Sequence, residues 1–197
     1  MLNSLLLLDE RLFVLLNARW HCGVLDVVMP FVTNLDNWRL PILLALLALV
    51  LFGGARGRWA ALLAVLALAL GDQVSSHWLK PLVGRTRPCH VVEPLRLLVS
   101  CSGSFSFPSS HATNIAASMT IFALFYRRLT GVFAFLAFLV GYSRVYVGVH
   151  YPFDVLAGWL LGIGIAFFLY HVWLCLYRKC WENWVPFHAS NAGGRLP

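Results

Sequence analysis

Long apolar runs dominate this sequence, and three short polar blocks lie between them. The first block spans residues 80–88, the second 108–111 and the third 143–154. Together they hold bases, two histidines and a carboxylate. Ionisable groups are expensive to place beside membrane segments, where they are functional by default. The blocks therefore predict a functional site assembled at the ends of apolar helices.

The composition places the chain among membrane proteins. Hydrophobic residues make up 60% of its 197 positions and charged residues 12%, with a mean hydropathy of +0.76. Soluble domains are nearer half apolar and a quarter charged. No internal repeat, low-complexity tract or linker divides the sequence. We expect a single domain over residues 1–197 with an all-α fold, a polytopic bundle of membrane helices.

Five apolar runs are long enough to cross a membrane, which takes about 20 residues; they are 37–53, 59–79, 111–126, 129–147 and 153–177. Residues 1–36 are less regular, because charges at 9–11 interrupt one apolar stretch and a second, 24–32, is short. Here we predict an interfacial amphipathic helix and a half-inserted helix, a hairpin that could act as a sixth span. Residues 37–177 would form the catalytic helical core, and 178–197 a tail.

Paired basic residues predict the orientation of the bundle. They occur at 56–58, 127–128 and 178–179, all on one side of the predicted bundle. Basic loops favour the cytoplasm, so the tail would be cytoplasmic and the three polar blocks would share the external face. These markers and the blocks account for most of the net charge of +7. The charge therefore does not indicate nucleic-acid binding.

Two of the five cysteines, Cys89 and Cys101, flank one loop on the predicted external side. A disulfide between them would persist in an oxidising compartment, and closing a loop of this kind contributes about 3 kcal/mol. The alternative is two free thiols near an interface. Neither a CxxC pair nor a His/Cys cluster with zinc spacing occurs, so no metal site is predicted.

The third block pairs a histidine with an acid. His150 and Asp154 are four residues apart, which on a helix places them on one face, and Pro152 suits the first turn of a helix. A carboxylate in reach of an imidazole fixes its tautomer and supports nucleophilic attack. The alternative is a structural pair at a helix start.

The second block begins another helix. Ser109 and Ser110 precede His111, and serine is a favoured N-cap. A helix N-terminus with free N–H groups binds anions, so the block could hold phosphate oxygens with His111 poised as an acid. The alternative is an ordinary cap beside an interfacial histidine.

Cations come from the first block and from the start of the third. Arg87 and Arg144 offer planar forks that match phosphate oxygens, and Lys80 offers a point charge. One basic cluster at a span end is usually a contact with lipid headgroups. Three blocks in order on one membrane face favour a phosphate site instead.

In their residues and spacing the blocks resemble the signature of the type 2 phosphatidic acid phosphatase family, which comprises integral-membrane lipid phosphatases. The matching residues are Lys80, Arg87-Pro88, Pro108-Ser109-Ser110-His111, Ser143-Arg144, His150 and Asp154. The resemblance covers about residues 38–175. One position departs from the family pattern, because Ser110 stands where the family usually has glycine. Serine must adopt an ordinary φ/ψ there, but it keeps a hydroxyl donor, and we expect activity to survive.

The resemblance implies a role for each residue. His150 would be the nucleophile that forms a phosphohistidine, Asp154 would orient it, and His111 would protonate the leaving oxygen and later activate water. The phosphoryl oxygens would be held by Lys80, Arg87, Ser109, Ser110 and Arg144. Neither a metal nor another cofactor is implied. Arg85 would lie at the edge of the site, and a polar stripe including Asp72 would stabilise helix contacts.

The family also implies the reaction, hydrolysis of phosphate from a membrane lipid phosphate or diphosphate at the external face of a plasma (inner) membrane. Among bacterial members, an undecaprenyl diphosphate phosphatase is the leading expectation. Phosphatidylglycerophosphate, phosphatidate or lipid A phosphatases, and a lipid phosphotransferase, would use the same residues. A vanadium haloperoxidase and a non-enzymatic transporter are the alternatives of other classes. Membrane lipids are the only partners expected, without an obligatory protein partner.

Overall fold

Helices make up most of the computed structural model, which describes residues 2–93 and 95–189. The α-helices are α1 (Leu2–Val14), α2 (Gly23–Thr33), α3 (Arg39–Phe52), α4 (Gly54–Asp72), α5 (Lys80–Val83), α6 (Ser110–Phe125), α7 (Thr130–Tyr146) and α8 (Pro152–Ala189). The π-helical or 3-10 segments between them are η1 (Leu15–Arg19), η2 (Leu35–Asn37), η3 (Gln73–Leu79), η4 (Pro88–His90) and η5 (Arg127–Leu129). No strand occurs among the described residues, so the predicted all-α fold is confirmed.

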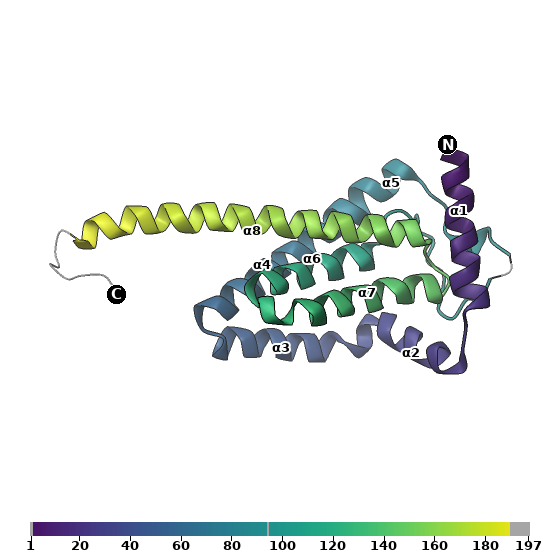
Figure 1. The fold of residues 1–197 in the computed structure, drawn as a ribbon, viewed down its shortest axis with the longest axis horizontal. Coiled ribbons are helices and arrows are strands. Elements are labelled where there is room, and N and C mark those ends of the chain that lie inside the picture. Colours follow the sequence, from purple (N-terminus) through teal and green to yellow (C-terminus); the bar gives the residue numbers. More distant parts are fainter. Residues whose placement is uncertain (1, 94, 190–197) are drawn as a thin grey trace.

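Helix α6 lies at the centre of the bundle and contacts α4, α7 and α8, which run alongside it (Figure 1). Its buried face carries small side chains such as Ala112 and Ala116. The facing position of α8 is a glycine, and a Cβ on Gly158 would come within 2.7 Å of the Ser109 carbonyl oxygen. Small residues let membrane helices approach closely. The first turns of α6 and α8 are therefore brought together.

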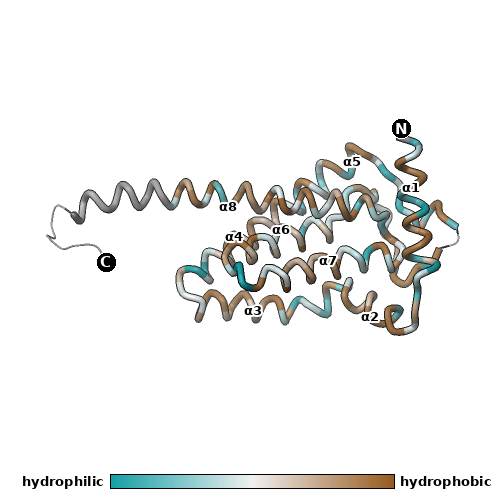
Figure 2. Tube along the Cα trace, viewed as in Figure 1, coloured by the Kyte–Doolittle hydropathy of each residue, from teal (hydrophilic) through white to brown (hydrophobic). Residues whose placement is uncertain are grey.

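Three helices are long and apolar enough to cross a membrane: Gly54–Val83, which joins α4, η3 and α5, Arg127–Tyr146 and the α8 segment Pro152–Tyr177. Figure 2 shows hydrophobic residues along these helices and hydrophilic residues gathered at the ends of the bundle. The two other predicted spans are α3, with 14 residues, and α6, with 16. These are roughly 21 and 24 Å long, shorter than a hydrocarbon core of about 30 Å. The chain is a helical membrane bundle in which three of the five predicted spans meet this test.

The N-terminal segment contains two helices that meet at a bend of 116°, Asn3–Arg19 and Gly23–Thr33. Taken together they are long and apolar enough for one broken span or a re-entrant loop, and they occupy the place of the predicted hairpin. Helix α1 lies across one end of the bundle, against α8 (Figure 1). It therefore closes that end.

Helix α8 continues past residue 177, where the last span is predicted to end, and reaches Ala189. The segment predicted as a cytoplasmic tail thus begins as helix. Its residues 190–197 lie outside the described residues.

The three polar blocks meet at one end of the bundle. Helix α5 and helix α7 end there, and α6 and α8 begin there (Figure 1). The basic loops at 56–58 and 127–128 lie at the other end, where Arg56 donates to the Phe125 carbonyl and lies 4.8 Å from the centre of the Tyr126 ring. The sequence predicts this separation. Which end faces the cytoplasm stays a prediction.

Candidate active site

The loop between α5 and α6, residues 84–109, carries the first two blocks to the end of the bundle. Helix α5 ends at Gly84, whose positive φ of 64° suits a helix C-cap. The Ser106 amide then donates to the Arg85 carbonyl at 2.7 Å, which folds the loop back on itself. The chain enters α6 through Ser109, the N-cap of that helix. The loop therefore lies over the starts of α6 and α8.

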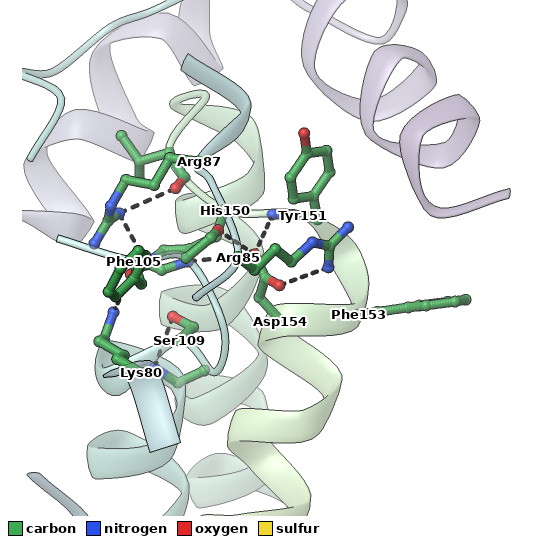
Figure 3. Close-up of polar contacts among 12 residues, drawn as sticks. Lys80, Arg85, Arg87, Phe105, Ser109, His150, Tyr151, Phe153 and Asp154 are labelled. Carbon is green, nitrogen blue, oxygen red and sulfur yellow. Dashed lines mark hydrogen bonds and ion pairs between the residues drawn. The ribbon is translucent and has the colours of Figure 1, made fainter. Parts of the chain in front are cut away.

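His150 is the centre of the site. It lies in the turn between α7 and α8, and its side chain is almost fully buried. Its Nε2 is 3.1 Å from Arg87 Nη1, and its Nδ1 is 3.5 Å from Asp154 Oδ2 and 3.4 Å from Ser106 Oγ. Figure 3 shows Arg87 on one side of this pair and Arg85 on the other. The structure thus confirms that the first and third blocks meet.

These contacts decide which nitrogen of His150 carries the proton. A guanidinium can only donate hydrogen bonds, so the contact with Arg87 requires a lone pair on Nε2. The proton then lies on Nδ1, facing the Asp154 carboxylate, which holds the ring in this tautomer. Burial lowers the pKa of His150 to about 3, with the charges of Arg144 and Arg87 acting in the same direction. The site therefore presents a neutral imidazole with its lone pair on Nε2.

Asp154 lies in the first turn of α8 and is fully buried. Its Oδ2 accepts from the Tyr151 amide at 2.9 Å and from the Ser106 hydroxyl. Its Oδ1 accepts from Arg85 Nη1 at 2.7 Å. A buried carboxylate needs such donors, and the N-terminus of α8 favours its negative charge. The carboxylate is thereby fixed beside the His150 ring.

Two buried cations lie near the imidazole, Arg87 and Lys80. Arg87 donates to the carbonyl and hydroxyl of Ser104 at 2.8 and 2.9 Å and to the Val149 carbonyl at 3.0 Å. Lys80 donates to the Phe105 carbonyl at 2.7 Å, and the ammonium group has three donors. Among the described residues Lys80 has no second acceptor. Buried cations with unused donors favour a bound anion.

The second block forms the N-terminus of α6, as predicted. The Ser109 hydroxyl accepts from the Ala112 amide at 3.4 Å, and the Ser109 amide donates to the Asp154 carbonyl at 3.0 Å. The Ser110 hydroxyl lies 2.9 Å from that of Ser76 on η3. The block is thus tied both to α8 and to the helix that ends in α5.

His111 and Arg144 are less closely joined to this centre. His111 is exposed at the second position of α6 and makes no hydrogen bond with another described residue. Arg144 Nη1 donates to the Thr33 hydroxyl at the end of α2, while its buried Nε has no partner among the described residues. Their roles as acid and as phosphate ligand stay predictions.

Several contacts of the site do not follow from the three blocks. Ser104 and Ser106 lie between the first two blocks and bind Arg87 and Asp154. Arg85, predicted at the edge, contacts Asp154 directly. Asp9, on the N-terminal helix, contacts Arg85. In the sequence Asp9 stands out as an acid that interrupts an apolar run, whereas the loop serines carry no distinguishing pattern.

Cys89 and Cys101 form a disulfide that closes part of the loop between α5 and α6. The bridge predicted as one of two alternatives is thus present, with the two Cα atoms 6.4 Å apart. The same two sulfurs and His90 are the one group of potential metal ligands clustered among the described residues. Sulfurs joined to each other are not thiolate ligands. This cluster therefore does not serve as a metal site while the bridge exists.

Comparisons with known proteins agree with the geometry. The PAP2 superfamily matches residues 59–177, which include all three polar blocks and exclude α1, α2 and α3. Over 167 residues the chain is 34% identical to lipid A 4'-phosphatase of Bacteroides thetaiotaomicron, covering 79% of this chain and 72% of that protein. Over 155 residues it is 32% identical to undecaprenyl-diphosphatase BcrC of Bacillus subtilis, covering 76% of each.

The fold is also similar to a solved structure. The crystal structure of Aquifex aeolicus LpxE matches with a TM-score of 0.71 and 26% sequence identity, covering 83% of this chain and 95% of that chain. The similarity therefore extends beyond the polar blocks to the arrangement of the helices.

Proposed function

Because this chain belongs to the PAP2 superfamily and is a membrane lipid phosphatase, we propose that it acts through a phosphohistidine formed on His150. The observation that carries the proposal is the placement of His150 between Arg87 and Asp154. A neutral ring with its lone pair on Nε2 is the form that attacks phosphorus. A carboxylate at Nδ1 stabilises the positive charge that then develops.

In the first step the Nε2 lone pair of His150 forms a bond to the terminal phosphorus, and the bond from that phosphorus to the leaving oxygen breaks. In a lipid diphosphate the leaving oxygen is the one that bridges the two phosphorus atoms. His111 supplies the proton that the leaving oxygen takes up. The Nδ1 proton stays on the imidazole, beside Asp154. His111 is exposed and unengaged, so its ring is free to reach the leaving group.

The cations of the site stabilise the transferred group. Arg87 Nη1, which donates to Nε2 in the structure, turns its hydrogen to a phosphoryl oxygen once the lone pair is used. Lys80, Arg144 and the α6 N-terminus at Ser109 hold the other oxygens. Preorganised donors of this kind act where charge spreads in the transition state.

In the second step a water molecule attacks phosphorus and the P–N bond breaks, which returns the electron pair to Nε2 of His150. His111, now neutral after the first step, takes the proton from that water. Inorganic phosphate leaves with one oxygen from the water, and the oxygen released in the first step stays on the lipid product. The same residues therefore serve both steps with no net change in the enzyme.

For the substrate we propose undecaprenyl diphosphate, presented at the external face of a plasma membrane. This is supported by the similarity to undecaprenyl-diphosphatase BcrC along 76% of each chain, and by the basic loops at the opposite end of the bundle. A lipid A phosphatase is the second candidate, supported by the match to lipid A 4'-phosphatase over 79% of this chain. Both substrates present a phosphate on a lipid to the same residues.

The test is phosphate release by the purified chain in detergent from a panel of undecaprenyl diphosphate, lipid A, phosphatidylglycerophosphate and phosphatidate. We expect the highest kcat/KM with undecaprenyl diphosphate and none with His150→Ala. Acid-labile, alkali-stable radiolabel on the protein after a quenched turnover would identify phosphohistidine. Preference for lipid A would favour the second candidate, and label that survives His150→Ala would refute the intermediate.

A further inference from the structure

Asp9 is a fully buried acid on α1, outside the residues that match the superfamily. Its Oδ2 lies 2.7 Å from Arg85 Nη2, and its Oδ1 accepts from the Phe153 amide at 2.8 Å. Buried charge is retained only where it is paired. The two contacts join the N-terminal helix to the loop after α5 and to the first turn of α8.

Arg85 carries this contact on to the catalytic pair. Its Nη1 lies 2.7 Å from Asp154 Oδ1, and its guanidinium carbon lies 3.9 Å from the centre of the Tyr151 ring. Figure 3 shows the guanidinium between Tyr151 and Asp154. The two ends of one planar fork thus hold two carboxylates in fixed geometry. Asp9, Arg85 and Asp154 form a continuous ionic chain that ends at His150.

The charges of the three residues in this ionic chain determine the role of Asp9. Asp154 is next to the ring on which positive charge develops during attack, but the cation of Arg85 offsets the charge of Asp154. Asp9 adds a second negative charge, so the three groups together remain at net −1. Without Asp9, the arginine and Asp154 alone would sum to zero beside His150.

We infer that Asp9 is a positioning residue of the phosphatase site, which keeps Arg85 from cancelling the charge of Asp154. This inference rests on the proposed role of His150 as nucleophile. It assigns to the N-terminal helix a part in the chemistry besides its place across the end of the bundle. The alternative is that Asp9 only anchors α1.

The same N-terminal segment offers a matched control. Asp26 on α2 pairs with Arg96 at 2.6 Å and accepts from the Tyr146 hydroxyl at 2.7 Å. It is also a carboxylate that anchors the helix pair through an arginine, but it has no contact with Asp154. A purely structural role would make the loss of either carboxylate equivalent.

The experiment compares the purified unsubstituted chain with Asp9→Asn and Asp26→Asn, using the best substrate of the lipid panel. Asn retains an oxygen for the Phe153 amide and removes only the charge. We expect Asp9→Asn to lower kcat about tenfold or more with KM changed less than about twofold, the size of a remote electrostatic contribution. Asp26→Asn should lower the melting temperature without this loss of kcat.

A double variant separates charge from packing. Asp9→Asn combined with Arg85→Gln removes the carboxylate of Asp9 and also the guanidinium that offsets the charge of Asp154. We therefore expect kcat to be at least about threefold higher than in Asp9→Asn alone. Failure of this recovery, or equal kcat losses in Asp9→Asn and Asp26→Asn, would overturn the inference. If Asp9→Asn does not fold, the double variant is compared with Arg85→Gln: without the arginine to offset, removal of Asp9 should change kcat less than about threefold, and a further loss of about tenfold would overturn the inference.

His150→Ala is measured alongside. If it is inactive while Asp9→Asn equals the wild type, only the inference about Asp9 fails. If His150→Ala remains active, the proposed function fails first.

Discussion

Ser110 and Ser76 lie hydroxyl to hydroxyl at 2.9 Å, joining the start of α6 to η3. Ser76 donates its own hydrogen to Asp72 Oδ1 at 3.1 Å, so its oxygen accepts the hydrogen of Ser110. In this arrangement the hydroxyl hydrogen of Ser110 is already donated to Ser76 and is not free for a bound phosphate. Asp72 at the end of α4 and Ser76 on η3 thus determine where the hydroxyl hydrogen of Ser110 points, at the position where the family usually has glycine.

Ser76→Ala should therefore strengthen anion binding. Without its acceptor, the Ser110 hydroxyl can donate to phosphate, and a hydrogen bond to a charged group is worth about 1.5–3 kcal/mol. We expect the inhibition constant of orthovanadate to fall at least about tenfold, the factor that corresponds to the lower end of this range, measured with the purified enzyme.

The neighbouring Ser75→Ala is the control, since Ser75 is fully buried and its hydroxyl has no partner among the described residues. It should leave vanadate inhibition unchanged. Combining Ser76→Ala with Ser110→Gly should remove the gain. A weaker inhibition by vanadate in Ser76→Ala would contradict this account.

His150→Ala should reduce phosphate release to background, because no other described group places a lone pair between Arg87 and Asp154. His111→Ala should cost about 10²–10⁴ in kcat, the usual loss for a general acid or base. Asp154→Asn should be less severe, since it alters the partner of the ring and leaves Nε2 in place. Phosphate release is measured alongside melting temperature and gel filtration, and wild-type turnover by any of the three would argue against its assigned role.

The protonation state of His150 gives a test that does not depend on activity. Burial disfavours the charged ring and lowers its pKa from 6.5 to about 3, so the ring should stay neutral throughout pH 5–8. NMR of the chain with labelled histidines, assigned by loss of one signal in His150→Gln, should show no titration of that ring in this range. An inflection of the His150 signal near pH 6.5 would contradict the neutral nucleophile.

Local spacing in the sequence predicts the core of the site well. His150 and Asp154 are four residues apart and meet at the start of α8, and Ser109 caps α6 as a serine before a helix usually does. Such features depend on neighbours along the chain. The disulfide between Cys89 and Cys101 belongs to the same class, because both lie in one loop.

Long-range contacts explain what the sequence does not predict. The pairing of Asp9 with Arg85 joins residues far apart in the chain, and nothing in the apolar run around Asp9 indicates its partner. Ser106 binds Asp154 from a loop without periodicity. The apolar run 37–53 is longer than α3 for another reason: hydropathy marks the apolar residues, while the helix itself extends only from Arg39 to Phe52.

Activity should persist in EDTA and be inhibited by orthovanadate. Lys80, Arg87 and the α6 N-terminus supply the positive charge that a divalent ion brings in other phosphatases, and vanadate mimics the five-coordinate phosphoryl group. We expect kcat to change less than about twofold in EDTA, because the chelator removes none of the donors that stabilise the transition state. Activity lost in EDTA and restored by Mg²⁺ would indicate a metal-dependent mechanism.

The last prediction is that the end of the bundle carrying the site faces the outside of the cell. The basic residues at 56–58 and 127–128 lie at the other end, and such residues are retained in the cytoplasm. Single cysteines are placed at exposed positions of the two ends, Val91→Cys and Arg58→Cys, in a chain whose cysteines other than Cys89 and Cys101 are replaced. Those two can remain, because their disulfide does not react with maleimide. An impermeant maleimide applied to intact cells should label position 91 and should reach position 58 only after permeabilisation. Labelling of position 58 in intact cells, with position 91 protected, would reverse the orientation and place hydrolysis at the cytoplasmic face.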